Sequence, residues 1–154
     1  MKGRRVDNIY VIEGNPVSWK EAIQMTADEL YKNGCVEADF YQNCIKREQM
    51  YPTGLATLVP VAIPHAESCC SIHKNGICLL RLATPVSFHR MDNTQEELPV
   101  DFVLNLAVMD GAVQLRALQN TINLFQDKEF QSDIRKLKLQ QLKKVFVDKW
   151  KPES

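Results

Sequence analysis

The chain has 154 residues, of which 45% are hydrophobic and 25% are charged, so we expect one soluble globular domain over residues 1–154. Lysine plus arginine and aspartate plus glutamate number 19 each, and this balance excludes a global attraction to nucleic acid or to an anionic membrane. No apolar run approaches the roughly 20 residues that span a bilayer, which excludes direct membrane insertion.

The N-terminal part of the chain predicts one strand and then one helix. The run IYVIEG, residues 9–14, is short and apolar, as expected of a strand. Ser18 followed by Glu21 is a capping-box pattern that predicts a helix start, and Gly34 is a suitable residue to end that helix. One helical face between these ends carries Trp19, Ala22, Ile23, Thr26 and Leu30.

A second helix is predicted over residues 37–51, before Pro52 ends it. Its inward face would consist of Phe40 or Tyr41, Cys44 and Ile45. This register leaves Arg47 and Glu48 near the C-terminal end of the helix. The end of this helix therefore carries one cation and one carboxylate.

The middle of the chain is rich in predicted strands. Apolar or alternating runs cover residues 56–65, 76–85, 86–91 and 100–111, and proline, glycine or polar clusters separate them. The run DFVLNLAVM, residues 101–109, is apolar nearly throughout. Such a run is typical of a central strand that is covered on both faces.

Three helices are predicted after Asp110 and Gly111. One face of the first carries Leu115, Leu118, Ile122 and Phe125. The second, which is short, is marked by Phe130, Ile134 and Leu137, and the third by Leu139, Leu142, Val145, Phe146 and Trp150. Helices at both ends of a strand-rich middle predict an α/β sandwich with a central mixed sheet flanked by helices. The order of the strands cannot be read from the sequence.

The cysteines indicate a reducing compartment. Their number is odd, and no secretory signal precedes them, so we expect reduced thiols in a cytosol. Cys69 and Cys70 are adjacent and could form a metal site with His73. They lack the two-residue gap of zinc and thioredoxin motifs, and no second pair stands at ligand spacing, so we predict no bound metal.

His65 has the most unusual setting of the three histidines. It follows Pro64 at the end of an apolar run, and proline fixes its own φ angle and has no N–H. A side chain held so rigidly could be aimed as a nucleophile, and an imidazole with a pKa near 6.5 is largely neutral at cytosolic pH. A surface histidine at a strand end, without a function, is the alternative.

The remaining candidates for chemistry are weaker. His73 stands at a predicted turn and could be an auxiliary group, whereas His89 alternates with Phe88 and should face solvent. The stretch DGAVQLRAL has one glycine and no phosphate-loop lysine, and no serine stands in a G-x-S-x-G setting. Neither an NTPase nor a serine hydrolase is indicated.

One segment is specific. KREQMYPTGLATLVPVAIPHAE closely resembles the signature of the EIIA components of the sugar phosphotransferase system, in the fructose/mannitol class. The matching parts are Arg47-Glu48, Pro52-Thr53-Gly54 and Ile63-Pro64-His65. The resemblance extends over roughly residues 18 to 150. It implies a phosphotransferase component of the mixed α/β fold predicted above.

The resemblance also implies the roles of two residues. His65 would be the phosphoryl carrier, which accepts the group from the phosphohistidine of HPr and passes it to an EIIB component, usually to a cysteine. Through EIIB it would serve a membrane EIIC. Arg47 would lie near the phosphoryl group, where a planar guanidinium can bind two of its oxygens. A plain surface ion pair is the alternative for Arg47.

The mechanism requires His65 to be neutral at its attacking nitrogen. The other nitrogen should be held by a hydrogen bond to a backbone carbonyl or to a nearby side chain. Thr53 and Glu67 are candidates for the surroundings of the site because they are close in sequence, and His73 is a further candidate. No metal, nucleotide or organic cofactor is implied.

One position departs from the mannitol and fructose pattern. Those members carry a second histidine at the start of the helix after the central strand, where this chain has Gln114. Glutamine can donate a hydrogen bond to a phosphoryl oxygen but carries no charge. The galactitol branch resembles this chain more closely at this point, so galactitol is the predicted sugar.

Three roles remain in competition. The favoured role is a cytoplasmic phosphocarrier for a sugar transporter, and the alternatives are a regulatory phosphorelay domain and a binding module that is not phosphorylated. HPr and EIIB must both reach the histidine, so we expect an exposed apolar collar around it. The candidates for that collar are Ala56, Leu58 and Val59, with residues near Val113.

Overall fold

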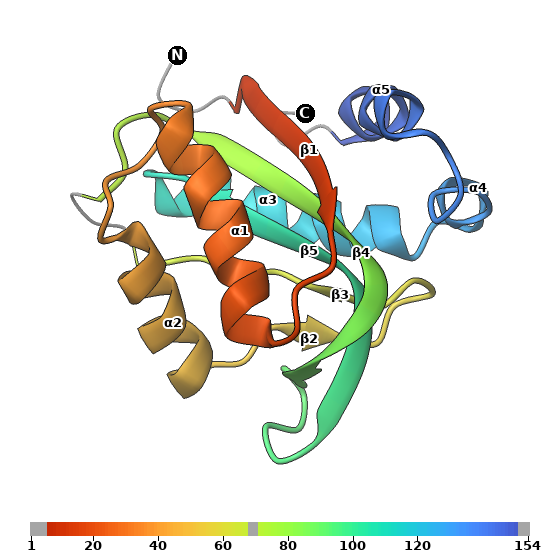
Figure 1. Cartoon of the computed structure of the whole chain (residues 1–154), viewed down its shortest axis with the longest axis horizontal. Helices are drawn as coiled ribbons and strands as arrows, with labels where there is room; N and C mark the ends of the chain where they lie inside the picture. The colour runs from red at the N-terminus through yellow and green to blue at the C-terminus, as the bar shows by residue number, and fades with distance from the viewer. Residues whose placement is uncertain (1–5, 68–70, 151–154) are drawn as a thin grey trace.

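The computed structural model describes residues 6–67 and 71–150. Its sheet has five strands in the order β1-β4-β5-β3-β2 (Figure 1). The strands are β1 (Asn8–Gly14), β2 (Gly54–Leu55), β3 (Val61–Ala62), β4 (Gly76–His89) and β5 (Glu97–Ala107). β1 pairs with β4, and β3 with β5, in parallel, whereas β4/β5 and β2/β3 are antiparallel. The predicted mixed sheet is confirmed.

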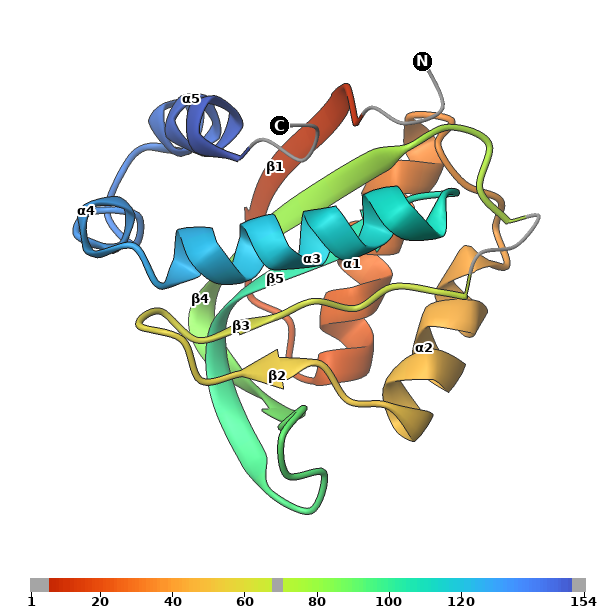
Figure 2. The same ribbon diagram turned by 180° about the vertical axis from the view of Figure 1, so that it is seen from behind.

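Helices cover both faces of this sheet (Figures 1 and 2). One face is covered by α1 (Trp19–Lys32) and α2 (Phe40–Met50), and the other by α3 (Gly111–Phe125), α4 (Lys128–Gln131) and α5 (Leu139–Lys149). The core therefore has two parts. Ile77 and Leu79 belong to the part under α3 to α5, and Cys78 and Leu80 to the part under α1 and α2, because successive strand residues point to opposite faces.

Local sequence explains the ends of α1. The hydroxyl of Ser18 accepts a hydrogen bond from the backbone N–H of Glu21, and so supplies a partner to one of the first N–H groups of the helix. After the helix, Gly34 has a φ of 77°, a left-handed conformation that only glycine adopts without strain. Both predicted helix signals are confirmed.

The strands of the middle differ from the predicted ones. The runs 76–85 and 86–91 form a single strand, β4, with an irregularity in pairing between Arg81 and Val86. Pro85 stands within this irregularity, where its missing N–H interrupts no regular ladder. The predicted strand 56–65 pairs regularly with its neighbours only over β3, because prolines on both sides lack the N–H that a longer ladder would use.

The buried face of α3 agrees only in part with the predicted one. The helix buries Val113, Ala117, Thr121, Leu124 and Phe125, and Leu115 is 56% exposed. The buried threonine is possible because its hydroxyl donates to the carbonyl of Ala117 and accepts from the indole N–H of Trp150. Of the predicted face, Phe125 is buried and Leu118 and Ile122 pack against the core, so the prediction was wrong only at Leu115.

Within the described residues, no helix is long and apolar enough to cross a membrane, and no three metal-binding side chains lie together. The three cysteines in this part, Cys35, Cys44 and Cys78, are buried and are not joined by disulfides. The candidate metal ligands Cys69 and Cys70 lie outside the described residues.

Candidate functional site

His65 is held in the sheet by its neighbour in sequence. The carbonyl of Pro64 accepts a hydrogen bond of 3.0 Å from the N–H of Leu106, and His65 makes an isolated parallel bridge with Leu106 in β5. The segment after β3 then passes between α2 and the N-terminal end of α3 (Figure 2). His65 is only 5% exposed there, so it is not the surface histidine of the alternative interpretation.

One nitrogen of the His65 imidazole is engaged in a hydrogen bond. Its Nδ1 lies 2.9 Å from the carbonyl oxygen of Ile63. Because a carbonyl can only accept, Nδ1 carries the hydrogen, and Nε2 keeps its lone pair. Burial lowers the pKa of His65, and the positive charge of Arg47 lowers it further. The ring is therefore neutral near pH 7, and its free lone pair is on Nε2.

Thr53 lies behind Ile63. Its hydroxyl accepts a hydrogen bond of 3.0 Å from the N–H of Ile63 and donates to Oε1 of Glu48 over 2.9 Å. Oε2 of Glu48 accepts the N–H of Thr53 over 2.8 Å. Burial raises the pKa of Glu48 to about 7. The sequence indicated Thr53 as a neighbour of the site, and the geometry links it to the imidazole through Ile63.

The surroundings of Arg47 leave one of its donors without a partner in the described part of the chain. Its guanidinium lies 4.6 Å from the centre of the Tyr51 ring, and its Nε is 3.5 Å from a carboxylate oxygen of Glu67. Its Nη1 is buried and has no hydrogen-bond partner among the described residues. A cavity of about 180 Å³ adjoins it, lined by Asn43, Lys46, Met50 and Glu67 in addition to Arg47. A buried N–H without a partner is costly, and a bound anion would supply the partner.

The other predicted site residues divide into two groups. Gln114, in the first turn of α3, reaches the carbonyl of Ala66 over a long 3.5 Å, and the carboxylate of Glu67 is 80% exposed beside Arg47. These two side chains lie next to the segment that carries His65. His73 is different, because its Nε2 pairs with Glu37 in the connection between α1 and α2.

The predicted apolar collar is wrong at Val59, which is fully buried. Ala56 is exposed, and so is Leu115, two residues after the fully buried Val113. Leu58 is exposed, but its N–H bonds to Gln126 after the C-terminal end of α3, whereas Gln114 near His65 lies at the other end of that helix. The error arose because sequence proximity does not account for the length of an extended segment, about 3.3 Å per residue.

Three exposed apolar residues lie closer to the site. Met50 is 68% exposed and Tyr51 is 57% exposed at the end of α2, where Met50 lines the cavity beside Arg47 and Tyr51 contacts the guanidinium. Leu115 follows Gln114 in α3 and is 56% exposed. These residues form an apolar rim on the two helices that flank the site.

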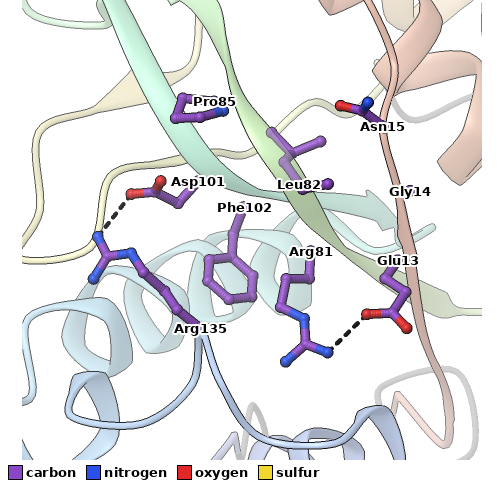
Figure 3. Close-up of a pocket in the computed structure, with 10 residues that line it drawn as sticks. Glu13, Gly14, Asn15, Arg81, Leu82, Pro85, Asp101, Phe102 and Arg135 are labelled. Atoms are coloured by element: carbon purple, nitrogen blue, oxygen red, sulfur yellow. Dashed lines mark hydrogen bonds and ion pairs between the residues drawn. The ribbon is translucent and has the colours of Figure 1, made fainter.

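A second, larger cleft lies at another part of the sheet (Figure 3). It has a volume of about 490 Å³ and contains two arginines. Arg81 pairs with Glu13 over 2.7 Å and donates to the carbonyls of Ile134 and Leu137, and Arg135 pairs with Asp101 over 2.7 Å. Both guanidinium groups therefore have partners within the protein. These contacts hold the connection between α4 and α5 against the sheet.

Sequence reasoning missed three groups of the site. They are the buried carboxylate of Glu48, the ring of Tyr51 under the guanidinium and the identity of Ile63 as the residue whose carbonyl holds the imidazole, although a bond to a backbone carbonyl was among the predicted ones. Glu48 was noticed only as the residue after Arg47 in the signature. Glu48 and Thr53 are only five residues apart, with Pro52 between them. This short separation was the feature of the sequence that could have indicated their contact.

The chain is similar to one family of known proteins. The family model described as "Phosphoenolpyruvate-dependent sugar phosphotransferase system, EIIA 2" matches residues 6–146. The ascorbate-specific PTS system EIIA component of Escherichia coli (strain K12) is 24% identical over 139 residues, which cover 90% of this chain and 88% of the relative.

Two solved structures show the same fold. The complex of enzyme IIAMTL and phosphorylated enzyme IIBMTL from Escherichia coli matches with a TM-score of 0.73 and 19% identity, over 92% of this chain and 94% of that one. The nitrogen regulatory protein IIA-Ntr from Neisseria meningitidis matches with a TM-score of 0.70 and 21% identity, over 93% and 97%.

Proposed function

The chain belongs to the EIIA 2 family of the phosphoenolpyruvate-dependent sugar phosphotransferase system, and we propose that it carries a phosphoryl group on Nε2 of His65. The observation that carries this proposal is the buried, neutral imidazole whose Nδ1–H is bonded to the carbonyl of Ile63. Its only available lone pair is on Nε2. The partnerless Nη1 of Arg47 supports the same assignment.

The transfer needs no acid or base from the protein. The lone pair of Nε2 forms the new N–P bond while the electrons of the donor's P–N bond return to the donor's histidine. Phosphoryl transfer of this kind depends on positioning and on stabilising charge. The ring of His65 gains positive charge in the step, and the carbonyl of Ile63, which accepts the Nδ1–H, stabilises it.

Two donors would bind the phosphoryl oxygens. The guanidinium of Arg47 supplies positive charge and a buried N–H group that has no other partner in the described part of the chain. Gln114 supplies a neutral N–H from the first turn of α3, because its 3.5 Å bond to Ala66 is long enough to be exchanged easily. Glu67 pairs with Arg47 and would yield to the incoming anion.

The partners follow from the family. HPr would donate the phosphoryl group in the cytoplasm, and an EIIB component would accept it on behalf of a membrane EIIC. The solved complex of enzyme IIAMTL with phosphorylated enzyme IIBMTL supports an EIIB partner. The apolar rim of Met50, Tyr51 and Leu115 is exposed beside the site and offers a surface for such transient contacts.

The sugar is a finer proposal. Gln114 and the resemblance of the surrounding segments favour galactitol, whereas the relatives reported above are named for ascorbate and mannitol. Transfer from the phosphorylated chain to purified galactitol, ascorbate and mannitol EIIB proteins would discriminate among them. If none of the three accepted the group, the regulatory alternative would gain support, since a regulatory protein, IIA-Ntr, shares the fold.

The proposed function is tested by intact mass after incubation with phosphoenolpyruvate, enzyme I and HPr. We expect wild type to gain one acid-labile phosphoryl group and His65→Ala to gain none. His89→Ala is the matched control, because that histidine is exposed and pairs with Glu97, at the opposite end of β5 from Leu106, which bridges His65. A wild-type protein that gained nothing from competent phospho-HPr would refute the carrier role.

A further inference from the structure

We propose that Glu48 and Thr53 are positioning residues that select the tautomer and the orientation of His65. The proposal deepens the proposed function, on which its effect on transfer rests. Neither residue would touch the phosphoryl group. They act through the backbone of Ile63, whose carbonyl oxygen accepts the Nδ1–H of the imidazole.

The first step is a continuous chain of hydrogen bonds. Glu48 accepts from the backbone N–H and the hydroxyl of Thr53, at 2.8 and 2.9 Å, and Thr53 accepts from the N–H of Ile63 at 3.0 Å. The carbonyl of Ile63 then meets His65 Nδ1 at 2.9 Å. All four residues are at most 5% exposed, so water does not compete for these bonds.

The direction of each of these bonds follows from the hydrogens that the bonded groups carry. The hydroxyl of Thr53 has one hydrogen and accepts the N–H of Ile63, so its own hydrogen must go to Glu48. The backbone groups of Ile63 set the direction of their own bonds, because an N–H donates and a carbonyl accepts. Glu48 accepts both the N–H and the hydroxyl of Thr53, and so holds Thr53 where its oxygen receives the N–H of Ile63.

The third step concerns the backbone of Ile63. The residue that follows it is Pro64, which has no N–H, so the carbonyl between them cannot be oriented through a hydrogen bond at the proline nitrogen. The orientation of the Ile63 carbonyl must therefore be set by contacts of the backbone before it or after it. The N–H of Leu106 holds the carbonyl of Pro64, and Thr53 holds the N–H of Ile63. Only the second of these contacts lies before the carbonyl that binds His65.

The fourth step is the cost of the carboxylate. Glu48 is 5% exposed and lies in the last turn of α2, where the helix dipole is negative. Burial and the dipole both disfavour a negative charge at this position. Stability alone would thus not favour a glutamate here, whereas a side chain that accepts both the N–H and the hydroxyl of Thr53 holds Thr53 against Ile63.

The test compares variants by NMR of the imidazole nitrogens in the unphosphorylated protein. We expect Nδ1 of His65 to be protonated and Nε2 unprotonated in wild type and in Thr53→Ser, which keeps the hydroxyl. Thr53→Val and Glu48→Gln should give a mixture of tautomers. The same two variants should accept a phosphoryl group from phospho-HPr roughly 10- to 100-fold more slowly, and Thr53→Ser should stay near the wild-type rate.

Thr121→Val is the matched control. It removes a buried threonine hydroxyl that bonds to Ala117 and Trp150 under α3, and it should leave the tautomer and the rate unchanged while lowering stability. If Thr53→Val proves unfolded, Glu48→Gln, which keeps the size of the side chain, decides the matter. A wild-type tautomer and rate in folded Glu48→Gln would overturn the proposal.

The two proposals fail differently. If wild type accepts no phosphoryl group, the carrier role fails, and the NMR measurement still tests the control of the tautomer. If wild type is phosphorylated but the tautomer of His65 is the same in all variants, the carrier role stands and the positioning role fails.

Discussion

Two regions of the molecule place arginines in clefts, and the regions differ in whether the guanidinium groups have partners within the described protein. The cleft of Arg81 and Arg135 is the larger, at about 490 Å³ against 180 Å³ beside Arg47. Its guanidinium groups pair with Glu13 and Asp101, whereas Arg47 keeps a buried Nη1 without a partner in the described residues. An unsatisfied donor indicates an anion site better than the volume of a cleft does.

If loss of the arginine charge had the same effect on the rate of phosphoryl acceptance in both regions, the distinction between them would be wrong. We expect Arg47→Gln to lower the rate of phosphoryl acceptance by about a hundredfold, because a charge-assisted donor to the phosphoryl group is lost. Arg135→Gln should leave the rate unchanged, since that guanidinium pairs with Asp101 at another site. Single-turnover transfer from phospho-HPr measures both, and equal rates for the two variants would contradict the distinction.

The pH dependence of stability also distinguishes the two regions, because the buried carboxylate of Glu48 lies in the His65 region. The pKa of Glu48 is raised by burial from 4.5 to about 7. The folded protein therefore holds a proton between these values that the unfolded chain has lost. From Glu48 alone, stability should fall by about 3 kcal/mol as the pH rises from 4.5 to 7.

His65 works in the opposite direction. Its pKa is lowered, so the unfolded chain holds more protons just below pH 6.5, and stability rises with pH there. The measurement is urea unfolding at several pH values in a His65→Ala background, with and without Glu48→Gln, so that the imidazole is absent from both. A pH dependence that is the same in both proteins would contradict the assignment to Glu48.

The smallest effect concerns the larger cleft. Arg81→Gln should lower stability by about 2 kcal/mol, because the carbonyls of Ile134 and Leu137 and the carboxylate of Glu13 lose a charged donor. The folded variant should accept a phosphoryl group at the wild-type rate. Thermal unfolding and the transfer assay check the two parts, and slower transfer with unchanged stability would reverse the roles assigned to the clefts.

Signals that depend on local geometry were readable in the sequence. The cap at Ser18, the left-handed Gly34 and the end of α2 before Pro52 all follow from backbone chemistry within a few residues. The burial of the run around Leu104 on both faces follows from its composition. The positions of Arg47 and His65 came from the signature, which is also local.

What the sequence could not give depends on distant partners. The merger of two predicted strands into β4 is decided by pairing with β5. The burial of Thr121 in α3 is possible because of its bond with Trp150, 29 residues away. The role of Thr53 depends on the N–H of Ile63, ten residues away. In each case a tertiary contact outweighed local hydrophobicity or proximity.

The order of the strands has a consequence for synthesis on the ribosome. β4 and β5 are adjacent in sequence and form a local hairpin, whereas β1 pairs with β4 across a long separation, with Asn8 opposite Gly76. The carbonyl beside His65 is held by Leu106. A nascent chain therefore cannot complete the carrier site until β5 has left the exit tunnel, and in the proposed role unfinished chains would not drain phosphoryl groups from the donor.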